Sequence, residues 1–397
     1  RAIIYKNELK NPVYKILKNN FIYFNYRTSK KEIAKSFSLL VKHIPLVDNR
    51  GRLVDYISKE QGQISLAKPK LTGNELKYTI DCIKSGWISS AGKYVKDFEK
   101  KFSKFTKIRN CLVVSSGTAA LHLALSTLNI KRGDEVIVPN LTFASPVNMV
   151  IHVGANPVFI DVDDKTYCID ENQIESKITK RTKAIIVVHL YGHPANLNKI
   201  KKIANKYNLY LIEDCAEALG SYYNNKHVGT FGDIATFSFY GNKLITTGEG
   251  GMLGFKKKSL RLKAEILRDH GMSKKKKYWH NEIGFNFRLT NIQSAVGVAQ
   301  LEKIKELLKN KKKLALNYKK YLNKLKFISL PGEHGKVKNS YWLYTIRLKK
   351  NLINYRKKIL QEMNLRKIEV RPIFFPMNMM PPYKKYFKKN EKFEVSK

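Results

Sequence analysis

Residues 238–251 read Ser-Phe-Tyr-Gly-Asn-Lys-Leu-Ile-Thr-Thr-Gly-Glu-Gly-Gly, and they indicate more about the chemistry of this chain than any other segment. Lys243 lies here between a short apolar strand, predicted at 234–239, and a glycine-rich turn. The backbone can hold a lysine in such a place and remove part of its water, which favours the uncharged amine and makes it a nucleophile for carbonyl carbons. Most other lysines of the chain must be solvated surface, so Lys243 needs a partner to be distinguished from them.

That partner occurs upstream, in Leu211-Ile-Glu-Asp-Cys-Ala-Glu217. Asp214 ends an apolar strand there, and burial of its carboxylate costs several kcal/mol unless the charge is paired. Pyridoxal phosphate needs an amine that forms an imine with its aldehyde and a carboxylate that pairs with its pyridinium nitrogen. We therefore predict this cofactor, with Lys243 and Asp214 as the catalytic pair. The alternative is that Asp214 only caps a following helix.

Apolar strand patterns alternate with helical patterns between about residues 67 and 310. The strands are predicted at 135–138, 157–161, 184–189, 209–214, 234–239 and 251–255. Short apolar strands separated by helices indicate an α/β fold with a mostly parallel sheet covered on both faces. Ligands of such sheets bind at the carboxyl ends of the strands, where Asp214 and Lys243 are expected.

A phosphate site is predicted where residues 113–125 read as a strand end, a tight turn and an amphipathic helix. Ser116, Gly117 and Thr118 form the turn. Gly117 permits close backbone approach, the helix N-terminus offers unpaired N–H groups, and Thr118 adds a hydroxyl. Ser238, five residues before Lys243, can supply a further hydroxyl. The alternative is that the Ser-Gly-Thr turn is a simple helix cap.

Three further residues are candidates for contact with the cofactor. Phe143 follows a predicted strand and could stack on the pyridine ring, or it could pack in the core. Glu217 lies one turn after Asp214 and would face the same site, within reach of the cofactor phenol oxygen or the substrate. Asn286 lies in a polar break between predicted helices, where formation of a turn is the alternative role.

The formal net charge of +43 raises the question of nucleic-acid binding, because a basic surface binds polyanions. The lysines are spread along the whole chain, and they greatly outnumber the arginines, whereas readers of bases and phosphates favour arginine. No nucleic-acid-binding motif occurs in the sequence. We therefore expect a lysine-rich solvated surface without a nucleic-acid partner, although such a surface would attract an anionic sugar nucleotide.

The cysteines, the hydropathy and the first residue bound the remaining possibilities. Cys82, Cys111, Cys168 and Cys215 lack the spacing of a zinc site or a disulfide framework, so we expect reduced thiols, no metal and a cytoplasmic protein. No apolar run reaches the roughly 20 residues that span a bilayer, so no membrane insertion is expected. The chain begins with Arg1 rather than Met, which suggests a fragment or a processed product.

Three regions are expected along the chain, at 1–62, 63–310 and 311–397. The first holds a helix-like stretch at 31–41 and a predicted hairpin at 43–54. It resembles the closing half of a CBS module, a nucleotide-sensing regulatory unit; an ordinary hairpin is the alternative. The second region is the large cofactor-binding domain. The third, which includes a strand-like run at 341–348, is expected to be a small α/β domain, incomplete because the chain ends within polar sequence.

The glycine turn, the aromatic residue, the aspartate, the serine, the lysine and the asparagine occur in a fixed order. This order resembles that of the sugar-nucleotide aminotransferases of the DegT/DnrJ/EryC1/StrS type, which have the fold type I architecture. The resemblance covers about residues 65–390. The segments that carry it are Ser85-Gly-Trp-Ile-Ser-Ser90, Ser116-Gly-Thr-Ala-Ala120, Leu190-Tyr-Gly-His-Pro194, Glu213-Asp-Cys-Ala-Glu217, residues 238–251, Arg268-Asp-His-Gly-Met272 and Tyr278-Trp-His280. Residues 241–251 and 268–272 are most similar to the perosamine synthases, which act at C4 of a GDP-linked 4-keto-6-deoxy sugar.

The resemblance implies pyridoxal phosphate as cofactor, L-glutamate as amino donor and a nucleotide-linked keto sugar as acceptor. It implies that Lys243 is joined to the cofactor, that Asp214 binds the pyridinium nitrogen and that Phe143 stacks on the ring. Members of this family are homodimers with shared active sites, so Asn286 would reach the cofactor phosphate of the neighbouring subunit. The residues expected to hold the phosphate are Ser116, Gly117, Thr118 and Ser238. The residues expected near the sugar nucleotide are Trp87, Ser89, Ser90, His189 and Asn378.

Two positions differ from the family pattern, since Glu217 stands where many relatives have glutamine and Asn378 stands where histidine is expected. The predicted reaction is amination at C4 of the sugar, for the biosynthesis of a surface polysaccharide or glycan. The alternatives are amination at C3, a UDP- or dTDP-linked sugar, and a nucleotide-sensing regulator with an inactive aminotransferase domain. A dehydratase of the same family is disfavoured, because those relatives replace the cofactor lysine with histidine and this chain has Lys243.

Overall fold

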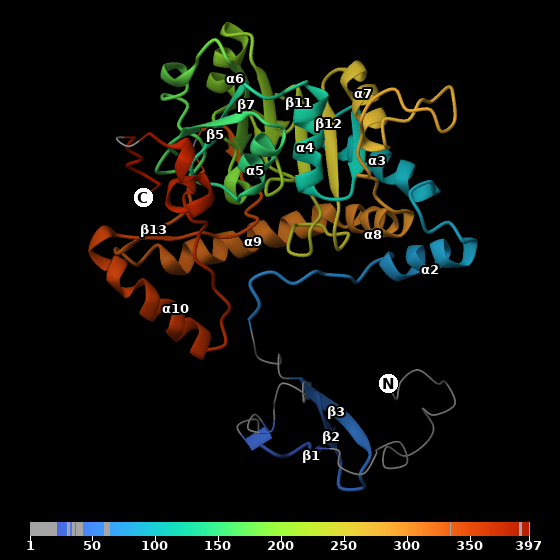
Figure 1. Cartoon of the computed structure of the whole chain (residues 1–397). Coiled ribbons are helices and arrows are strands. Elements are labelled where there is room, and N and C mark those ends of the chain that lie inside the picture. The colour runs from blue at the N-terminus through green and yellow to red at the C-terminus, as the bar shows by residue number, and fades with distance from the viewer. Residues whose placement is uncertain are drawn as a thin grey trace. The chain divides into compact units, whose positions relative to one another are not determined.

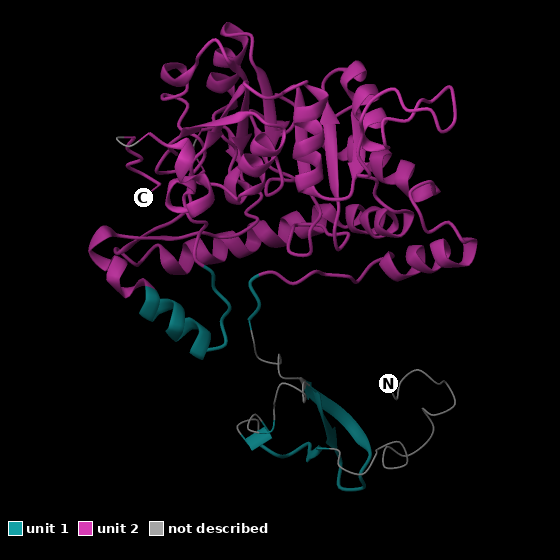
Figure 2. Cartoon of the chain, viewed as in Figure 1, with its two compact units in different colours: residues 1–66, 357–371 teal, residues 67–356, 372–397 magenta. Residues whose placement is uncertain are grey.

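The computed structural model of the chain describes residues 22–29, 32–33, 36, 43–58, 64–333, 335–388 and 391–396. The chain divides into two compact units (Figure 2). The first consists of residues 1–66 and 357–371, and the second of residues 67–356 and 372–397. The domain limits expected from the sequence, at residues 62 and 310, remain predictions.

The first unit contains, in its described residues, a three-stranded sheet of order β1-β2-β3. Its strands are β1 (Phe24–Asn25), β2 (His43–Val47) and β3 (Leu53–Ser58). The antiparallel pair β2 and β3 confirms the predicted hairpin, and Asp48 closes the turn by accepting the N–H groups of Arg50 at 2.8 Å and Arg52 at 2.9 Å. The helix expected at 31–41 lies mostly outside the described residues. The CBS-like interpretation remains a prediction.

The second unit is built on a seven-stranded sheet, counted over the described residues, of order β4-β12-β11-β8-β7-β5-β6 (Figure 1). Its strands are β4 (Asn110–Val114), β5 (Glu135–Pro139), β6 (Asn156–Ile160), β7 (Thr182–Val188), β8 (Tyr210–Asp214), β11 (Ile234–Ser238) and β12 (Gly251–Phe255). β12 is antiparallel to both of its neighbours, and every other pairing in this sheet is parallel. The mostly parallel sheet predicted from the apolar runs is thus confirmed.

Helices connect these strands and cover the sheet. They are α2 (Glu75–Ser85), α3 (Lys93–Thr106), α4 (Gly117–Thr127), α5 (Ser145–His152), α6 (Leu197–Lys206), α7 (Lys258–Arg268), α8 (Asn291–Glu302) and α9 (Ile304–Leu322). A further helix, α10 (Arg356–Leu365), belongs from residue 357 onward to the first unit. Local signals set their ends. Thr290 and Gln293 form a capping box at the start of α8, and Gly86, with φ 72°, ends α2 in the left-handed region that glycine adopts without strain.

Two apolar layers lie on opposite faces of the sheet, because successive side chains of a strand point to opposite sides. One layer packs residues of α3, α6 and α8 against Leu211, Ala235 and Phe237. The other packs α4, α5 and α7 against Ile212 and Ile234. Since α4 is buried almost all round, the prediction of an amphipathic helix there is wrong: the helix lies under other elements rather than at the surface.

Short elements complete the second unit. The strands are β9 (Tyr222–Tyr223), β10 (Lys226–His227), β13 (Ile328–Ser329), β14 (Val337–Lys338) and β15 (Arg347–Leu348). The 3-10 turns are η3 (Glu175–Lys177), η4 (Leu190–Gly192), η5 (Lys350–Tyr355), η6 (Met377–Met379) and η7 (Pro381–Tyr386). The strand expected over 341–348 is wrong except at its last two residues. Tyr341 has φ 50°, and the Tyr344 ring stacks on Tyr318 of α9 at 4.9 Å, so packing replaces the alternation of a strand.

No helix among the described residues is both long enough and apolar enough to cross a membrane.

Candidate active site

Lys243 lies in a loop that follows β11 and returns to β12. The loop is closed by backbone hydrogen bonds in which Lys243 N–H donates to Tyr240 O at 2.9 Å and Thr247 N–H donates to Phe239 O at 2.9 Å. Its glycine-rich end packs against the backbone that precedes α4. A Cβ at Gly251 would lie 2.4 Å from Ser116 O, so only glycine fits there. The sequence pattern around Lys243 thus joins the lysine loop to the start of α4.

The amine of Lys243 lies between a carboxylate and an aromatic ring. Its Nζ is 3.5 Å from Oε1 of Glu217 and 3.8 Å from the ring centroid of Trp342. The lysine side chain is 13% exposed, so most of it is removed from water. This is the partly desolvated lysine that the sequence predicted, and residues of two other segments, Glu217 and Trp342, contact its amine.

Glu217 is buried and faces Lys243, as predicted. Its Oε2 accepts the N–H of Tyr191 at 2.8 Å. Burial raises the pKa of Glu217 to about 7, against the charge of Lys243 and the Tyr191 hydrogen bond, which lower it. Tyr191 has φ 53°, a conformation that is strained for a bulky residue and that directs its N–H to this carboxylate. Such strain is typical of a site whose geometry is held by its surroundings.

Asp214 ends β8 and is buried next to the lysine loop. Its Oδ1 accepts the N–H of Ala216 at 3.0 Å and a long hydrogen bond from Thr236 Oγ1 at 3.5 Å. Burial raises the pKa of Asp214, and the Ala216 hydrogen bond and the charge of Lys243 oppose this only in part. The segment directly after Asp214 forms turns that lead to β9 rather than a helix, so the helix-cap alternative is wrong. A buried carboxylate with so few donors fits a cationic ring N–H, as pyridoxal phosphate presents.

The residues predicted to hold a phosphate meet at the N-terminus of α4. Gly117 approaches Ser238 so closely that a Cβ on Gly117 would lie 2.7 Å from the Ser238 Cβ. Thr118 Oγ1 is 2.8 Å from Ser145 Oγ, and Ser116 caps the helix by accepting the Ala119 N–H at 3.0 Å. The cap is therefore observed. The hydroxyls and the helix N-terminus also form a cradle that fits an anion.

Phe143 and Asn286 lie at the surface of the second unit. The Phe143 ring is exposed, and its centroid is 5.7 Å from that of Phe374. Asn286 lies between α7 and α8, pairs with Asp269 in an isolated bridge, and accepts the Arg288 Nε–H at 3.1 Å. Both roles, stacking on the cofactor ring and reaching a neighbouring subunit, remain predictions.

The loop expected near the sugar nucleotide is tied to the start of α8. Asn291 donates from Nδ2 to Trp87 O at 2.6 Å and from its backbone N–H to Ser89 O at 2.7 Å. Trp87 and Ser89 have exposed side chains, and Ser90 is half-buried. The other expected sugar residue, Asn378, is half-buried and accepts from Asn140 Nδ2 at 3.1 Å. These residues stay predicted contacts of the sugar.

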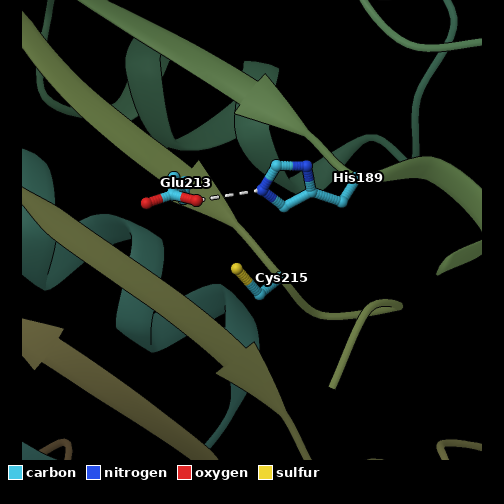
Figure 3. A group of neighbouring side chains, drawn as sticks. All are labelled: His189, Glu213 and Cys215. Carbon is cyan, nitrogen blue, oxygen red and sulfur yellow. Dashed lines mark hydrogen bonds and ion pairs between the residues drawn. The ribbon is translucent and has the colours of Figure 1, made fainter. Parts of the chain in front are cut away.

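His189 lies in a buried group with Glu213 and Cys215 (Figure 3), whose ligand atoms are within 4.8 Å of one another. Nδ1 of His189 accepts the Ala195 N–H at 3.1 Å, so the ring proton is on Nε2, which donates to Glu213 at 3.2 Å. Burial raises the pKa of the Cys215 thiol far above its usual value. Protein groups thus occupy the histidine and the carboxylate, and the geometry favours a structural anchor over a metal centre. A sugar contact of His189 would require the release of one of its ring nitrogens.

Aromatic residues that the sequence interpretation missed line one side of the site. The Tyr191 ring stacks on Trp342 at 6.2 Å and on Phe374 at 5.6 Å, and Phe374 in turn contacts Phe143. Tyr191 lies within a segment used for the family resemblance, but Trp342 lies in the run interpreted as a strand. The aromatic composition of residues 341–344 was the signal that could have revealed it.

A desolvated lysine, a buried carboxylate and an anion cradle at the carboxyl ends of a mostly parallel sheet define a pyridoxal phosphate-dependent transferase of fold type I. Sequence comparison matches residues 69–397 to the DegT/DnrJ/EryC1/StrS aminotransferase family, and the chain belongs to this family. It is a pyridoxal phosphate-dependent sugar-nucleotide aminotransferase.

Individual relatives agree with this assignment. The chain is 44% identical over 327 residues to GDP-perosamine synthase of Escherichia coli O157:H7, covering 82% of this chain and 89% of that protein. Among solved structures it is similar to PseC of Helicobacter pylori, an aminotransferase involved in the biosynthesis of pseudoaminic acid, with TM-score 0.79 and 30% identity over 84% of this chain and 90% of that one. It is also similar to the PLP-form of the sugar aminotransferase Spr1654 of Streptococcus pneumoniae, with TM-score 0.77 and 28% identity over 81% and 88% of the two chains.

Proposed function

We propose that this chain transfers the amino group of L-glutamate to the C4 ketone of a GDP-linked 4-keto-6-deoxy sugar, for the biosynthesis of a surface polysaccharide. The observation that carries the proposal is the contact set of Lys243, Asp214 and Glu217, in a chain 44% identical to a GDP-perosamine synthase. Amination at C3 and UDP- or dTDP-linked sugars are the alternatives that the experiment below separates.

Different residues at the strand ends would bind different parts of the cofactor. Asp214 would bind the ring nitrogen and Gly117, Thr118 and Ser238 the phosphate, with Ser116 fixing the start of α4. When bound, pyridoxal phosphate supplies an aldehyde that exchanges amines and a ring that accepts electrons. Lys243 would contribute its Nζ as nucleophile and then as the base and acid that moves a proton.

Asp214, Glu217 and Tyr191 would hold the cofactor ring and the lysine amine in position. The negative charge of Asp214 would keep the ring nitrogen protonated, because a buried carboxylate stabilises a cation beside it. Glu217 holds the amine of Lys243 at 3.5 Å and is itself held by the Tyr191 N–H. A carboxyl group at this position can accept or donate a proton near neutral pH, since burial raises the pKa of Glu217 to about 7.

We further propose that the active form is a homodimer with shared sites. On α2, the apolar side chains of Leu76, Ile80 and Ile83 are exposed at helical spacing. An exposed apolar stripe of this kind is typical of a protein interface. Ile283, close to Asn286 in the chain, is 95% exposed, which suits a loop that reaches a second copy.

We place the reaction in the cytoplasm. All four cysteines, Cys82, Cys111, Cys168 and Cys215, are free and buried. Unpaired thiols are what a reducing compartment favours, and disulfides are frequent where it is oxidising.

The decisive experiment incubates the protein with L-glutamate and a panel of GDP-, UDP- and dTDP-linked 4-keto-6-deoxy sugars, with 3-keto isomers beside them. We expect an amino sugar only from the GDP-linked 4-keto compound, identified by mass and by the position of the nitrogen in its NMR spectrum. Lys243→Ala serves as the inactive control. Bound cofactor without amino transfer to any sugar would contradict the proposal and would favour a regulatory role.

A further inference from the structure

We propose that Trp342 and Glu217 form a resting site for the amine of Lys243, which holds that amine whenever it is not joined to the cofactor. The proposal rests on the proposed role of Lys243 and adds a positioning residue, Trp342, from a distant part of the chain. Released lysine must return to the same place in every catalytic cycle, and a long flexible side chain does so faster if its free position is defined.

The first observation is the position of the ammonium group. Nζ lies 3.8 Å from the Trp342 ring centroid, within the range of a cation–π contact, and 3.5 Å from a Glu217 oxygen. Trp342 is 5% exposed and Glu217 is buried, so both contacts form away from bulk water, where they are stronger.

The second observation is that the amine selects one of two available carboxylates. Asp214 and Glu217 are both buried near Lys243, and both feel its charge. In the part of the chain that the structure describes, Lys243 makes its ion pair with Glu217, whereas Asp214 forms none. A free amine held at Glu217 leaves Asp214 available to the cofactor nitrogen, so the two carboxylates do not compete for the same partners.

The third observation is that the indole is firmly built into the site. Its Nε1–H donates to Asn242 O at 2.8 Å, which fixes Trp342 to the backbone directly before Lys243. The loop that carries it is held by Ser340 N–H, which donates to Ser221 Oγ at 3.0 Å, while Ser221 Oγ–H donates to Gly192 O at 2.6 Å. A Cβ at Gly192 would lie 2.7 Å from Ser340 Oγ, so this glycine permits the close approach of the loop.

The test measures how fast Lys243 is acetylated in the full chain after removal of the cofactor, by mass spectrometry of its peptide at one fixed pH. Trp342→Leu removes the ring face, and Glu217→Gln removes the charge with little change in shape. We expect each variant to raise the acetylation rate of Lys243 by about threefold or more. Trp342→Phe keeps a ring face and should leave the rate within about twofold of the wild type.

A matched control is Trp279→Leu. The Trp279 ring also contacts a lysine, since Lys276 Nζ lies 4.0 Å from its ring centroid, but Trp279 is exposed. This variant should leave the rate at Lys243 unchanged. Thermal melting confirms that each variant is folded, and if Trp342→Leu is not, the pair Trp342→Phe and Glu217→Gln decides the question.

An unchanged rate at Lys243 in folded Trp342→Leu and in Glu217→Gln would overturn the resting site. Failure of the proposed function would be detected by a different experiment. Borohydride reduction of the wild-type protein loaded with cofactor would then attach the cofactor to a residue other than Lys243. Attachment at Lys243 together with unchanged acetylation rates would leave the function intact and reject only this inference.

Discussion

Glu213 and Asp214 are consecutive residues of β8, and their carboxylates point to opposite faces of the sheet. Glu213 accepts from His189 Nε2 at 3.2 Å and from three backbone N–H groups. Asp214, on the other face, accepts one good hydrogen bond from Ala216 and a long one from Thr236. One step along a strand therefore separates a fully satisfied carboxylate from one that has capacity for another partner.

The two environments shift the pKa values of Glu213 and Asp214 in opposite directions. Burial acts to raise the pKa of both groups, but the hydrogen bonds and the His189 side chain outweigh it and lower the pKa of Glu213. The pKa of Asp214 is raised, because its burial is opposed only in part. This difference is why Glu213 is interpreted as structural and Asp214 as the partner of a cation.

Asp214→Asn should weaken binding of pyridoxal phosphate by about 100-fold or more, because it removes the charge that pairs with a buried cationic nitrogen. Fluorescence titration of the cofactor-free chain measures the dissociation constant. Asp233→Asn is the matched control, since Asp233 accepts the Leu211 N–H at the opposite end of the same strands and should affect the cofactor little. Equal binding by Asp214→Asn and the wild type would argue against the assigned role.

Gly117→Ala should lower the affinity for pyridoxal phosphate and for free phosphate, because its Cβ would lie 2.7 Å from the Ser238 Cβ and would push apart the cradle. Overpacking of this kind costs about 1–3 kcal/mol. The same substitution at Gly241, where a Cβ would meet nothing within 4 Å, should leave the affinity unchanged. Equilibrium dialysis with both ligands distinguishes the two variants, and equal losses would show that the cradle is not the cause.

Glu217→Gln should change how stability depends on pH. The pKa of Glu217 is raised from 4.5 to about 7 in the folded chain, so its neutral form is favoured by folding. That contribution is fully present below about pH 4.5 and is lost as the pH rises through 7. The variant should therefore match the wild type at pH 4 and exceed it above pH 7, by on the order of 3 kcal/mol. Thermal melting of the cofactor-free proteins across this pH range tests the prediction. A stability difference between variant and wild type that does not change with pH would contradict it.

Gly192→Ala should destabilise the chain more than Gly133→Ala. Both glycines have left-handed backbones, at φ 96° and 92°, so both variants meet a similar conformational cost. Only the Cβ at position 192 would meet a neighbour, Ser340 Oγ at 2.7 Å, whereas that at position 133 would meet nothing within 4 Å. We expect a melting temperature lower by about 5 °C or more in the first variant than in the second. Equal melting temperatures would show that the Ser340 loop can move without cost.

Ile83→Asp should convert a dimer to a monomer, since a charge on the exposed apolar stripe of α2 would have to be buried in the interface. Lys77→Asp, an exposed position on the same helix outside the stripe, is the control and should remain dimeric. Sedimentation velocity measures both masses. A wild-type chain that sediments as a monomer would refute the proposed assembly.

Much of the candidate site could be predicted from the sequence, because its parts carry local signatures. Lys243 lies within a glycine-rich turn, Asp214 ends an apolar strand, and Gly117 lies between a strand and a helix. Each pattern reflects a constraint that acts within a few residues: where a strand ends, where a backbone must pack closely, or where a helix begins. The parallel sheet followed from the same kind of reasoning, since apolar runs of strand length report burial on both faces.

Contacts between distant segments had no such signature. Trp342 lies in a run that has the composition of a strand, yet the tertiary packing of residues 339–344 against Tyr191, Ser221 and α9 gives it a different backbone. Likewise, the sequence places Glu213, Asp214 and Glu217 within five residues, and only the structure shows which carboxylate is satisfied, which is left for a cation and which faces Lys243. Local propensity and burial patterns are encoded residue by residue, whereas the partner of a buried charge depends on which remote segment packs beside it.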